Sequence, residues 1–260
     1  MIIINGGLMD DTTRKKIKEM LKSVITSKLD SYSPETEYRP FFDAIFNRKQ
    51  IVTHSILQSF YTTFGMSVYE QMAKILAEGA GFHAERQHIL EGEIDSKTEA
   101  LINKIHMQLK KGKKANKQNE IESIRKSIRK SKPSKDPDSV VDVFIRKPDG
   151  EEFYFDITTV KPNKKEFITL KKKLLRWVGL RLSQNKKVKV STGVVIPYNP
   201  YHPKKYKRWT KGGFYDNEEL IIGKEFWNFV ADHDVYDELI EVFKEIGKEL
   251  RKRIDGLTSA

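Results

Sequence analysis

Two short segments that alternate apolar and polar residues flank a tight turn in the second half of the chain, and they limit the folds open to it. VVDVFI and EEFYFDIT have the β-branched and aromatic enrichment of strands, and the stretch 147–150, Lys-Pro-Asp-Gly, joins them. Proline presets the first turn position, and Gly150 supplies the left-handed conformation that closes a three-residue loop with a bulge. The sequence therefore predicts an antiparallel hairpin with Lys147 opposite Glu151.

Counting outward from the turn fixes which side chains share a face of the hairpin. The predicted pairs are Arg146–Glu152, Phe144–Tyr154 and Asp142–Asp156. The opposite face is then wholly apolar and consists of Val141, Val143, Ile145, Phe153, Phe155 and Ile157. A slip of one residue would send an aspartate into the core, which supports this register. We therefore expect Asp142 and Asp156 to be direct neighbours, about 5 Å apart at Cβ.

Two carboxylates at that distance repel each other unless a positive group lies between them. A divalent cation would offset the repulsion. The chain has no Cys and no convincing His cluster, so oxygen ligands alone favour Mg²⁺, with Mn²⁺ as a substitute, over zinc. The alternatives are a turn miscounted by one residue and an Asp142 that pairs with Arg146 or with a helix lysine. A metal-binding carboxylate pair is the preferred interpretation.

Charge and composition limit the partners, the site chemistry and the location that we expect for this protein. The 260 residues include 48 Lys and Arg against 36 Asp and Glu, a net charge of +12, which favours a partner rich in phosphate. The absence of Cys excludes disulfides, thiolate metal sites and a cysteine nucleophile. The N-terminal apolar run is too short for a signal peptide and no run would span a membrane, so we expect a cytoplasmic protein with no membrane partner. Glycine-rich nucleotide-binding fingerprints are missing, so we expect no nucleotide cofactor.

Apolar periodicity predicts the remaining elements. Helical spacing marks residues 14–29, where a preceding threonine can cap the start, and residues 51–80, as a buried helix or a broken pair of helices. Residues 164–184 form an amphipathic helix, and KVKVSTGVVIPY is typical of a further strand, so a crossover with a parallel component is expected. Two helices follow near the C-terminus.

These elements predict an α/β fold, a mixed β-sheet flanked by helices, in a single domain over residues 1–260. It has a large helical N-terminal region (residues 1–135), a sheet-containing catalytic core (residues 136–200), and a long loop with C-terminal helices over residues 201–260. The lysine-rich joint KKGKKANKQN, residues 110–119, has two interpretations: a solvated link between two helices, or an arm that contacts phosphates.

The predicted carboxylate pair and several other segments resemble a known family. Two metal-binding carboxylates on a strand pair, followed by a lysine, are what phosphodiester hydrolysis needs. Asp142, Asp156 and the nearby lysines, with a literal Pro-Asp at 137–138, resemble the PD-(D/E)xK nuclease superfamily. FDITTVKPNKKEF, LKKKLLRWVGLRLS, PYNPYHPKKYKRW, KEFWNFV and VYDELIEVFKEIGKEL are similar to the TdeIII-like type II restriction endonucleases, associated with GGNCC-type sites. The resemblance covers most of 136–253 and implies Mg²⁺-dependent, sequence-specific cleavage of double-stranded DNA by a homodimer.

One position departs from the superfamily pattern, which expects a lysine where this chain has Thr158. Lys161 is the nearest replacement, and Lys164 and Lys165 are alternatives. If no lysine serves, the chain is a basic DNA-binding protein with a degenerate metal site. A DNA repair or structure-specific nuclease on the same fold is the other alternative.

The resemblance also implies a carboxylate from a helix ahead of the strands. Glu85 is the candidate, with Glu91 behind it, and Asp138 is the alternative to Asp142 as the first carboxylate. His83 and His88 lie nearby, although lone histidines are usually not ligands. The expected catalytic residues are Asp142, Asp156 and Lys161, and the expected metal ligands are Asp142, Asp156 and Glu85.

A long irregular loop, residues 197–217, mixes aromatic, proline and basic residues. Loops of this length in a compact domain are often functional. The candidate DNA-binding residues are Lys204, Lys205, Lys207 and Arg208. The alternative is a surface loop whose aromatic residues pack on the core, and Trp177, Trp209 and Trp227 are expected to serve packing.

Overall fold

The computed structural model describes residues 8–33, 39–132, 135–207, 215 and 218–259. Its helices are α1 (Asp11–Asp30), α2 (Pro40–Asp43), α3 (Arg48–Thr63), the π-helical turn η1 (Phe64–Val68), α4 (Tyr69–Gly79), α5 (Ser96–Lys110), α6 (Lys117–Ser127), α7 (Lys164–Gln184), α8 (Lys224–Ala231) and α9 (Tyr236–Ser259). Its strands are β1 (His83–Glu91), β2 (Lys135–Arg146), β3 (Glu152–Ile157), β4 (Val190–Ile196) and β5 (Leu220–Ile222). None of the described helices combines the length and apolar character needed to cross a membrane.

The strands of the described chain form one mixed sheet in the order β1-β2-β3-β4-β5. β2 pairs antiparallel with both β1 and β3, whereas β3–β4 and β4–β5 are parallel. α7 connects β3 to β4, because parallel neighbours need a crossover rather than a hairpin. The predicted mixed sheet flanked by helices is confirmed, including the parallel component.

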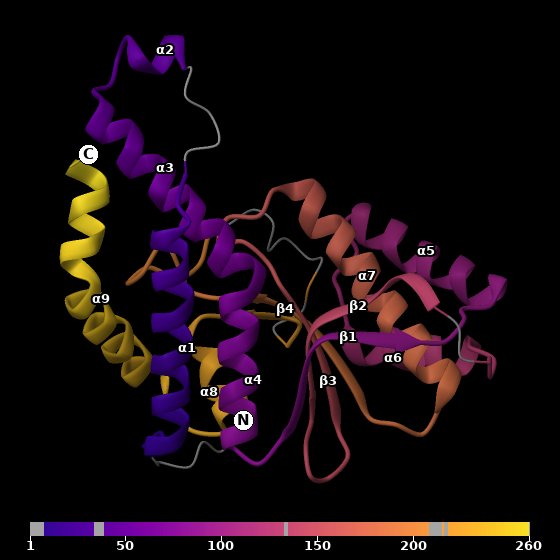
Figure 1. Cartoon of the computed structure of the whole chain (residues 1–260). Coiled ribbons are helices and arrows are strands. Elements are labelled where there is room, and N and C mark those ends of the chain that lie inside the picture. The colour runs from indigo at the N-terminus through magenta and orange to yellow at the C-terminus, as the bar shows by residue number, and fades with distance from the viewer. Residues whose placement is uncertain (1–7, 34–38, 133–134, 208–214, 216–217, 260) are drawn as a thin grey trace.

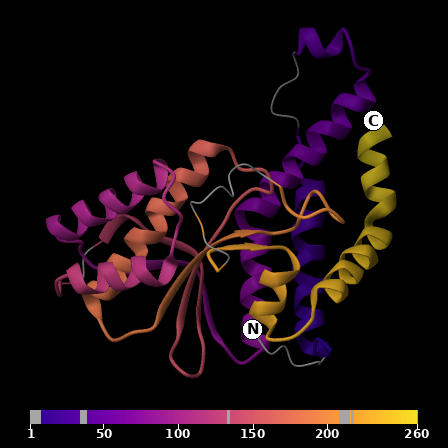
Figure 2. The ribbon, with the colours of Figure 1, turned by 180° about the vertical axis from the view of Figure 1, so that it is seen from behind.

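Helices cover both faces of the sheet (Figure 1). One layer packs α1, α4, α8 and α9 on inward side chains such as Val143, Phe155 and Val195. The other packs α5, α6 and α7 on Phe144, Tyr154 and their neighbours. The view from behind shows the same two layers on either side of the strands (Figure 2). Both faces are therefore buried, as a sheet with parallel strands requires.

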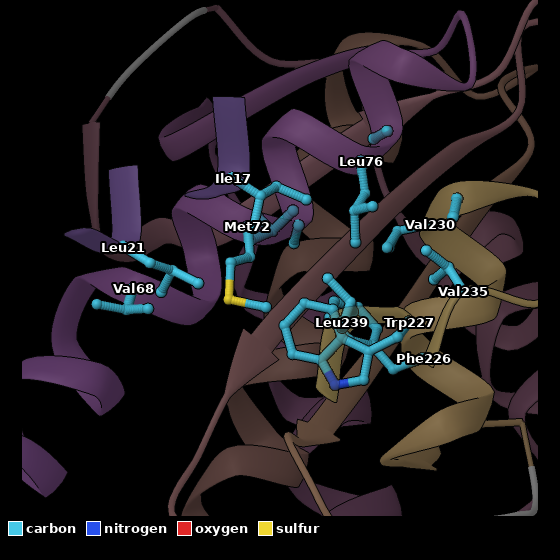
Figure 3. Packing of buried hydrophobic residues seen from close by; sticks show 14 of the residues in the cluster. Ile17, Leu21, Val68, Met72, Leu76, Phe226, Trp227, Val230, Val235 and Leu239 are labelled. Atoms are coloured by element: carbon cyan, nitrogen blue, oxygen red, sulfur yellow. The ribbon is translucent and has the colours of Figure 1, made fainter. Parts of the chain in front are cut away.

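The larger apolar core lies between the sheet and the first of these layers. Ile17 and Leu21 of α1 are fully buried at helical spacing and meet Met72 of α4 (Figure 3). Trp227 of α8 closes the other side of the same cluster, and its indole donates a hydrogen bond to Pro197 O at 2.8 Å. This bond fixes α8 to the chain that leaves β4.

The hairpin has the predicted register from the turn to the Val143–Phe155 pair, but the predicted Asp142–Asp156 ladder pair is not formed. Lys147 N donates to Glu151 O at 3.0 Å, and Gly150 has a φ of +85°, the left-handed conformation that the turn requires. The ladder pairs are Val143–Phe155, Phe144–Tyr154, Ile145–Phe153 and Arg146–Glu152.

The predicted apolar face is wrong at one residue. Val141 lies in the core beneath α7, whereas Val143 lies in the core beneath α4. On β1, Gln87 falls between the Arg86–Val143 and His88–Val141 pairs and has a φ of +50°, which interrupts the regular alternation. The side chains of β2 on either side of Asp142 therefore enter different cores, and Gln87 lies across from Asp142 on β1.

The predicted helical N-terminal region also needs correction, because it contains β1. The strand presents charged and polar residues along an edge of the sheet, a pattern that protects edges from pairing with other chains. The start of α1 is capped by Asp10, whose Oδ1 accepts from Thr13 N at 2.9 Å, rather than by a threonine. Residues 51–80 form the broken helix pair, interrupted by η1.

We predict that Leu21→Ala lowers the free energy of unfolding by about 2–5 kcal/mol, because it leaves a cavity in a fully buried position. Leu8→Ala is the matched control, since Leu8 is 85% exposed and should change stability by less than about 0.5 kcal/mol. Urea unfolding followed by circular dichroism measures both. Equal effects of the two substitutions would contradict the assignment of this core.

Candidate active site

Asp142 follows directly after the last regular pair of the β2–β3 ladder. At this point a side-chain acceptor takes the place of a backbone carbonyl, because Asp142 Oδ2 accepts a hydrogen bond from Ile157 N at 2.8 Å. Asp156, one residue before that amide, is only 5% exposed. The hairpin thus brings the two predicted carboxylates together at the point where the strands part.

The electrostatics of the pair are unfavourable in the absence of a cation. The pKa of Asp142 is raised to about 7, first by burial and then by the charge of Asp156, although the Ile157 amide and Lys173 act in the opposite direction. Glu70 adds a smaller upward contribution to the same pKa. The carboxyl of Asp142 therefore lies among two negative groups and one positive group.

The positive group comes from α7. Lys173 Nζ lies 2.6 Å from Asp156 Oδ2, and it also lies 4.9 Å from the centroid of the Trp177 ring, one turn further along the helix. Thr158, which occupies the position of the expected lysine, is buried and donates from Oγ1 to Glu166 Oε1 at 2.7 Å. Glu166 and Asn163 form a capping box, so Thr158 secures the start of the helix that carries Lys173.

A third carboxylate approaches from the opposite layer. Glu70, in the first turn of α4, is 3% exposed. Its Oε2 lies 3.2 Å from Arg86 Nη2, and its Oε1 accepts from Gln87 Nε2 at 3.0 Å. The two partners are β1 residues at the interruption in alternation, so β1 orients Glu70 next to the site.

Glu85 is not on a helix, as the sequence predicted, but on β1 opposite Phe144. Its carboxylate contacts His83 Nε2 at 2.7 Å and His88 Nδ1 at 2.5 Å, which lower its pKa. The largest charge effects on Asp142 come from other residues, so Glu70 replaces Glu85 as the helix carboxylate near the pair. Glu91 is exposed at the end of β1.

The structure does not bring Lys161 to the carboxylates. Its side chain is exposed, and its Nζ lies 5.8 Å from the centroid of the Tyr201 ring. Lys164 and Lys165 are also exposed, in the first turn of α7. The side chain of Asp138 lies outside the described residues. Among the described side chains, Asp142 is the carboxylate beside Asp156, and its choice over Asp138 stays a prediction.

The basic loop leaves β4 at the same sheet edge as the carboxylates, since β3 and β4 are parallel with Ile157 beside Val195. Lys204, Lys205 and Lys207 are exposed, while Arg208 lies outside the described residues, as does Trp209. Tyr206 is buried, and its hydroxyl donates to Val160 O at 3.2 Å. Tyr206 packs on the core, as the surface-loop alternative expects, while the DNA-binding role of the exposed lysines stays a prediction.

Beside this loop lies a cavity of about 1020 Å³. Aromatic residues of α4, α8, α9 and the loop line much of it, including Tyr69, Tyr198, Trp227, Tyr236 and Phe243. Basic residues, Lys205 among them, also line this cavity.

The donor set fits a hard divalent cation. Within the described ranges no group of three or more His, Cys, Asp or Glu is placed to hold a metal ion. Mg²⁺ does not need such a group, because it keeps several waters and is usually bound by one or two carboxylates together with substrate phosphates. Asp142 and Asp156 supply two carboxylates, and their mutual repulsion is relieved by a cation.

Sequence reasoning missed Lys173 and Glu70, although each left a signal. Glu70 occupies the same helical face as Ala73 and Ala77, both of which are fully buried. A glutamate on such a face needs a buried partner or a function. Lys173 lies on α7, which packs on the same sheet face as Asp156. Only the three-dimensional packing shows that Lys173, and not a neighbouring lysine, reaches that carboxylate.

We predict that Asp142→Asn stabilises the fold near neutral pH without divalent ions, by on the order of 1 kcal/mol or more. The pKa of Asp142 is about 7 in the folded chain against an ordinary 3.8, so the folded state binds the extra proton between these values. The free energy of unfolding of the wild type therefore falls as pH rises through this window. Asparagine keeps an acceptor for Ile157 N but does not ionise.

Urea unfolding at pH 5 and pH 8 with EDTA measures this difference. Asp149→Asn, at the exposed hairpin turn, is the control and should keep the wild-type pH dependence. An Asp142→Asn variant with unchanged pH dependence would show that this carboxyl is not the responsible group.

Comparison with known proteins identifies the family of the chain. The family described as type II restriction endonuclease, HinfI, matches residues 9–247, a span that contains all five strands of the described sheet. Type II restriction enzymes HgiCII and HgiEI, both from Herpetosiphon aurantiacus, are 24% and 25% identical to the chain over 269 and 262 residues. Each comparison covers 90% of this chain and 93% of the relative. The chain belongs to the HinfI family of type II restriction endonucleases, enzymes that cut DNA at specific sequences.

Proposed function

We propose that this site-specific deoxyribonuclease cuts double-stranded DNA with a Mg²⁺-dependent site of the PD-(D/E)xK type, formed by Asp142, Asp156 and Lys173. One observation carries the proposal: Lys173 Nζ lies 2.6 Å from Asp156 Oδ2, beside a second carboxyl whose pKa is raised by burial and by Asp156. The lysine that the superfamily pattern expects at position 158 is thus supplied from α7.

Each residue has a distinct role in this proposal. Mg²⁺, for which Mn²⁺ substitutes, would supply neutralisation of phosphate charge and a bound water of lowered pKa. Asp142 and Asp156 hold it, Asp142 in its ionised form. The ammonium of Lys173 orients the attacking water or stabilises the charge that develops on the phosphate. Glu70, fixed by Arg86 and Gln87, completes the negative environment from α4.

The same proposal includes how DNA is engaged. Exposed Lys204, Lys205 and Lys207 contact phosphates at the edge where β4 ends, with Arg208 next in sequence. The resemblance to the TdeIII-like group supports a GGNCC-type site. We propose a homodimer, because two strands of opposite polarity must be cut and a twofold axis relates them.

We predict that Lys173→Ala lowers kcat/KM for plasmid cleavage about 100-fold or more, since it removes a charge beside the reacting phosphate. Lys161→Ala is the matched control and should cleave at nearly the wild-type rate. The assay is digestion of a sequenced plasmid with Mg²⁺ or with EDTA, followed by end sequencing. The wild type should give discrete fragments with Mg²⁺, intact DNA with EDTA, and ends that reveal the site.

A second variant separates chemistry from folding. Thr158→Lys in the Lys173→Ala background restores a lysine at the position that the superfamily pattern prescribes and should recover some of the lost rate. Full activity of Lys173→Ala, or loss of activity in Lys161→Ala instead, would reject the assignment of Lys173. Intact plasmid under both conditions would reject Mg²⁺-dependent cleavage itself.

We also predict which lysines meet DNA. Replacing Lys204, Lys205 and Lys207 with alanine should weaken binding and reduce the slope of log K against log salt by about one for each lost phosphate contact. The equivalent triple variant at Lys110, Lys111 and Lys114 tests the other basic segment, which joins α5 to α6.

Fluorescence anisotropy with a labelled duplex and Ca²⁺ between 50 and 200 mM salt, roughly the range over which such contacts show, measures both slopes. A reduced salt slope in the α5–α6 variant alone would show that DNA binds at the α5–α6 segment and not at the loop after β4. Equal slopes in all three proteins would exclude both segments.

A further inference from the structure

The cavity beside the loop after β4 lies at the same edge of the sheet as the carboxylates. Tyr198, shortly after β4, and Gly223, directly after β5, both line it. β3, β4 and β5 are parallel neighbours, with Ile157 beside Val195 and Val195 beside Ile221. Because neighbouring strands are about 4.8 Å apart, the ends of β3 and β5 are separated by roughly 10 Å, close to three base pairs of DNA at about 3.4 Å each.

The first turn of α4 connects the cavity to the carboxylate site. Tyr69 lines the cavity. The next residue, Glu70, is 3% exposed and contributes, after burial and Asp156, to the raised pKa of Asp142. Consecutive residues of one helix therefore face the two places. A duplex cut at the carboxylates would pass within a few base pairs of the cavity.

Aromatic rings form much of the wall of the cavity. The ring centroid of Tyr69 lies 6.1 Å from that of Trp227, whose indole is fixed by its hydrogen bond to the chain after β4. Tyr198, Tyr236 and Phe243 are half-buried and line the same space. Half-buried rings of this kind are the surfaces on which nucleic-acid bases stack in proteins.

The wall that carries Tyr198 is held in place by the backbone around it. Gly223 N donates to Ile196 O at 2.8 Å, and a Cβ on Gly223 would lie 3.4 Å from Tyr198 Cα. Beyond Tyr198, Asn199 Oδ1 accepts a hydrogen bond from Tyr201 N at 2.9 Å. The cavity is therefore largely formed before a ligand enters, which lowers the entropic cost of binding.

Tyrosine hydroxyls supply the polar groups of the cavity. Those of Tyr69, Tyr198 and Tyr236 make no hydrogen bond with another residue in the part of the chain that the structure describes. The pKa of Tyr69 is raised first by burial and then by Tyr198 and Tyr236, so the three side chains lie close together. Each hydroxyl can both donate and accept, and a ligand would meet all three.

This combination of groups favours a nucleobase over an apolar partner. An apolar side chain would bury the three hydroxyls without hydrogen bonds, which is unfavourable. A nucleobase is planar, stacks on aromatic rings and carries donors and acceptors along its edge. The cavity of about 1020 Å³ is also at the upper end of small-molecule sites, roughly 300–1,000 Å³, and has room for a base with its sugar.

The substrate of the family supplies such a base. The chain belongs to a family of enzymes that cut DNA, and Lys205, exposed and part of the cavity lining, provides positive charge for an adjacent phosphate. Bases within a duplex are stacked and paired, so a base reaches the cavity only when it leaves the stack.

We propose that this cavity receives one base of the DNA substrate, turned out of the duplex within a few base pairs of the cut, and holds it against its tyrosine rings. Stacking on the rings and hydrogen bonds to the hydroxyls offset the loss of pairing. The inference rests on the proposed function in one respect: the phosphate bound at Asp142 and Asp156 places the duplex beside the cavity.

Binding to mismatched duplexes tests the proposal, with Ca²⁺ present so that the DNA stays intact. The duplex carries the cleavage site, located by end sequencing with whichever divalent ion supports cutting, and a mismatch at each base pair in turn. At one position the mismatch should strengthen wild-type binding about 10-fold, because the base is already unpaired. At the other positions of the site a mismatch should weaken binding. Fluorescence anisotropy measures each affinity.

Tyrosine variants connect that gain to the cavity. Tyr198→Ala combined with Tyr236→Ala should lose the gain, whereas the corresponding double phenylalanine variant keeps both rings and should keep a gain of about threefold or more. Tyr201→Ala is the matched control, since Tyr201 is a half-buried tyrosine of the same loop outside the cavity lining, and it should keep the full gain. A gain at no position, or a gain that persists in the double alanine variant, overturns the proposal.

Photocross-linking identifies the side chain that meets the captured base. With 5-iodouracil at the position of the gain, irradiation should join the DNA to Tyr198 or Tyr236, as peptide mass spectrometry would show. Linkage to a residue outside the cavity overturns the proposal. A lower mass of the double alanine variant in sedimentation equilibrium, without any cross-link in the wild type, assigns the cavity to a second copy and also overturns it.

These outcomes are separable from those of the nuclease proposal. A wild type that cuts DNA with Mg²⁺ but shows no mismatch gain rejects base capture alone. Lys173→Ala should keep the gain even where it no longer cuts, because capture uses the cavity and not the ammonium at Asp156.

Discussion

The candidate site depends on how the β2–β3 ladder ends. A backbone amide that loses its ladder partner in a buried region must find another acceptor, and here the acceptor of Ile157 N is the carboxylate of Asp142. This single bond holds one acidic group beside another, Asp156, against their repulsion. The arrangement is tolerated because the hairpin turn and the two apolar layers fix both strands independently of the site.

The buried charges elsewhere in the described chain show how unusual this is. Lys171 is fully buried, yet its Nζ lies 2.5 Å from Glu219 Oε2 and 2.6 Å from Glu120 Oε2. Arg181 likewise contacts Glu152 at 2.6 Å and lowers the pKa of that carboxyl. These charges are compensated by direct partners. At Asp142 the compensation is partial and the pKa is raised instead, which is typical of residues that act on a ligand.

Local rules predicted the hairpin and the crossover, because turn chemistry and apolar periodicity act over a few residues. Phe167, Leu174 and Val178 are buried on one side of α7, as the predicted amphipathic helix requires. The same rules failed at β1, where a polar edge strand lacks the apolar enrichment by which strands are recognised. They also failed for Lys173 and Glu70, because proximity to Asp156 and Asp142 is set by packing between elements far apart in the chain. Counting outward from the turn placed Asp142 near Asp156, but the ladder ends at Val143–Phe155 and a side-chain hydrogen bond to Ile157 N holds Asp142 there.

The spacing of two lysines on α7 has a mechanical result. Residues two apart on a helix point about 200° from each other, so Lys171 and Lys173 extend to opposite sides of the axis. Lys171 is held among buried carboxylates from α6 and from the segment before β5, while Lys173 reaches Asp156. A rotation of α7 about its axis that moved Lys173 away from Asp156 would therefore also break the contacts of Lys171 with its two glutamates. The two ion pairs therefore restrain rotation of α7 about its own axis and keep Lys173 beside Asp156.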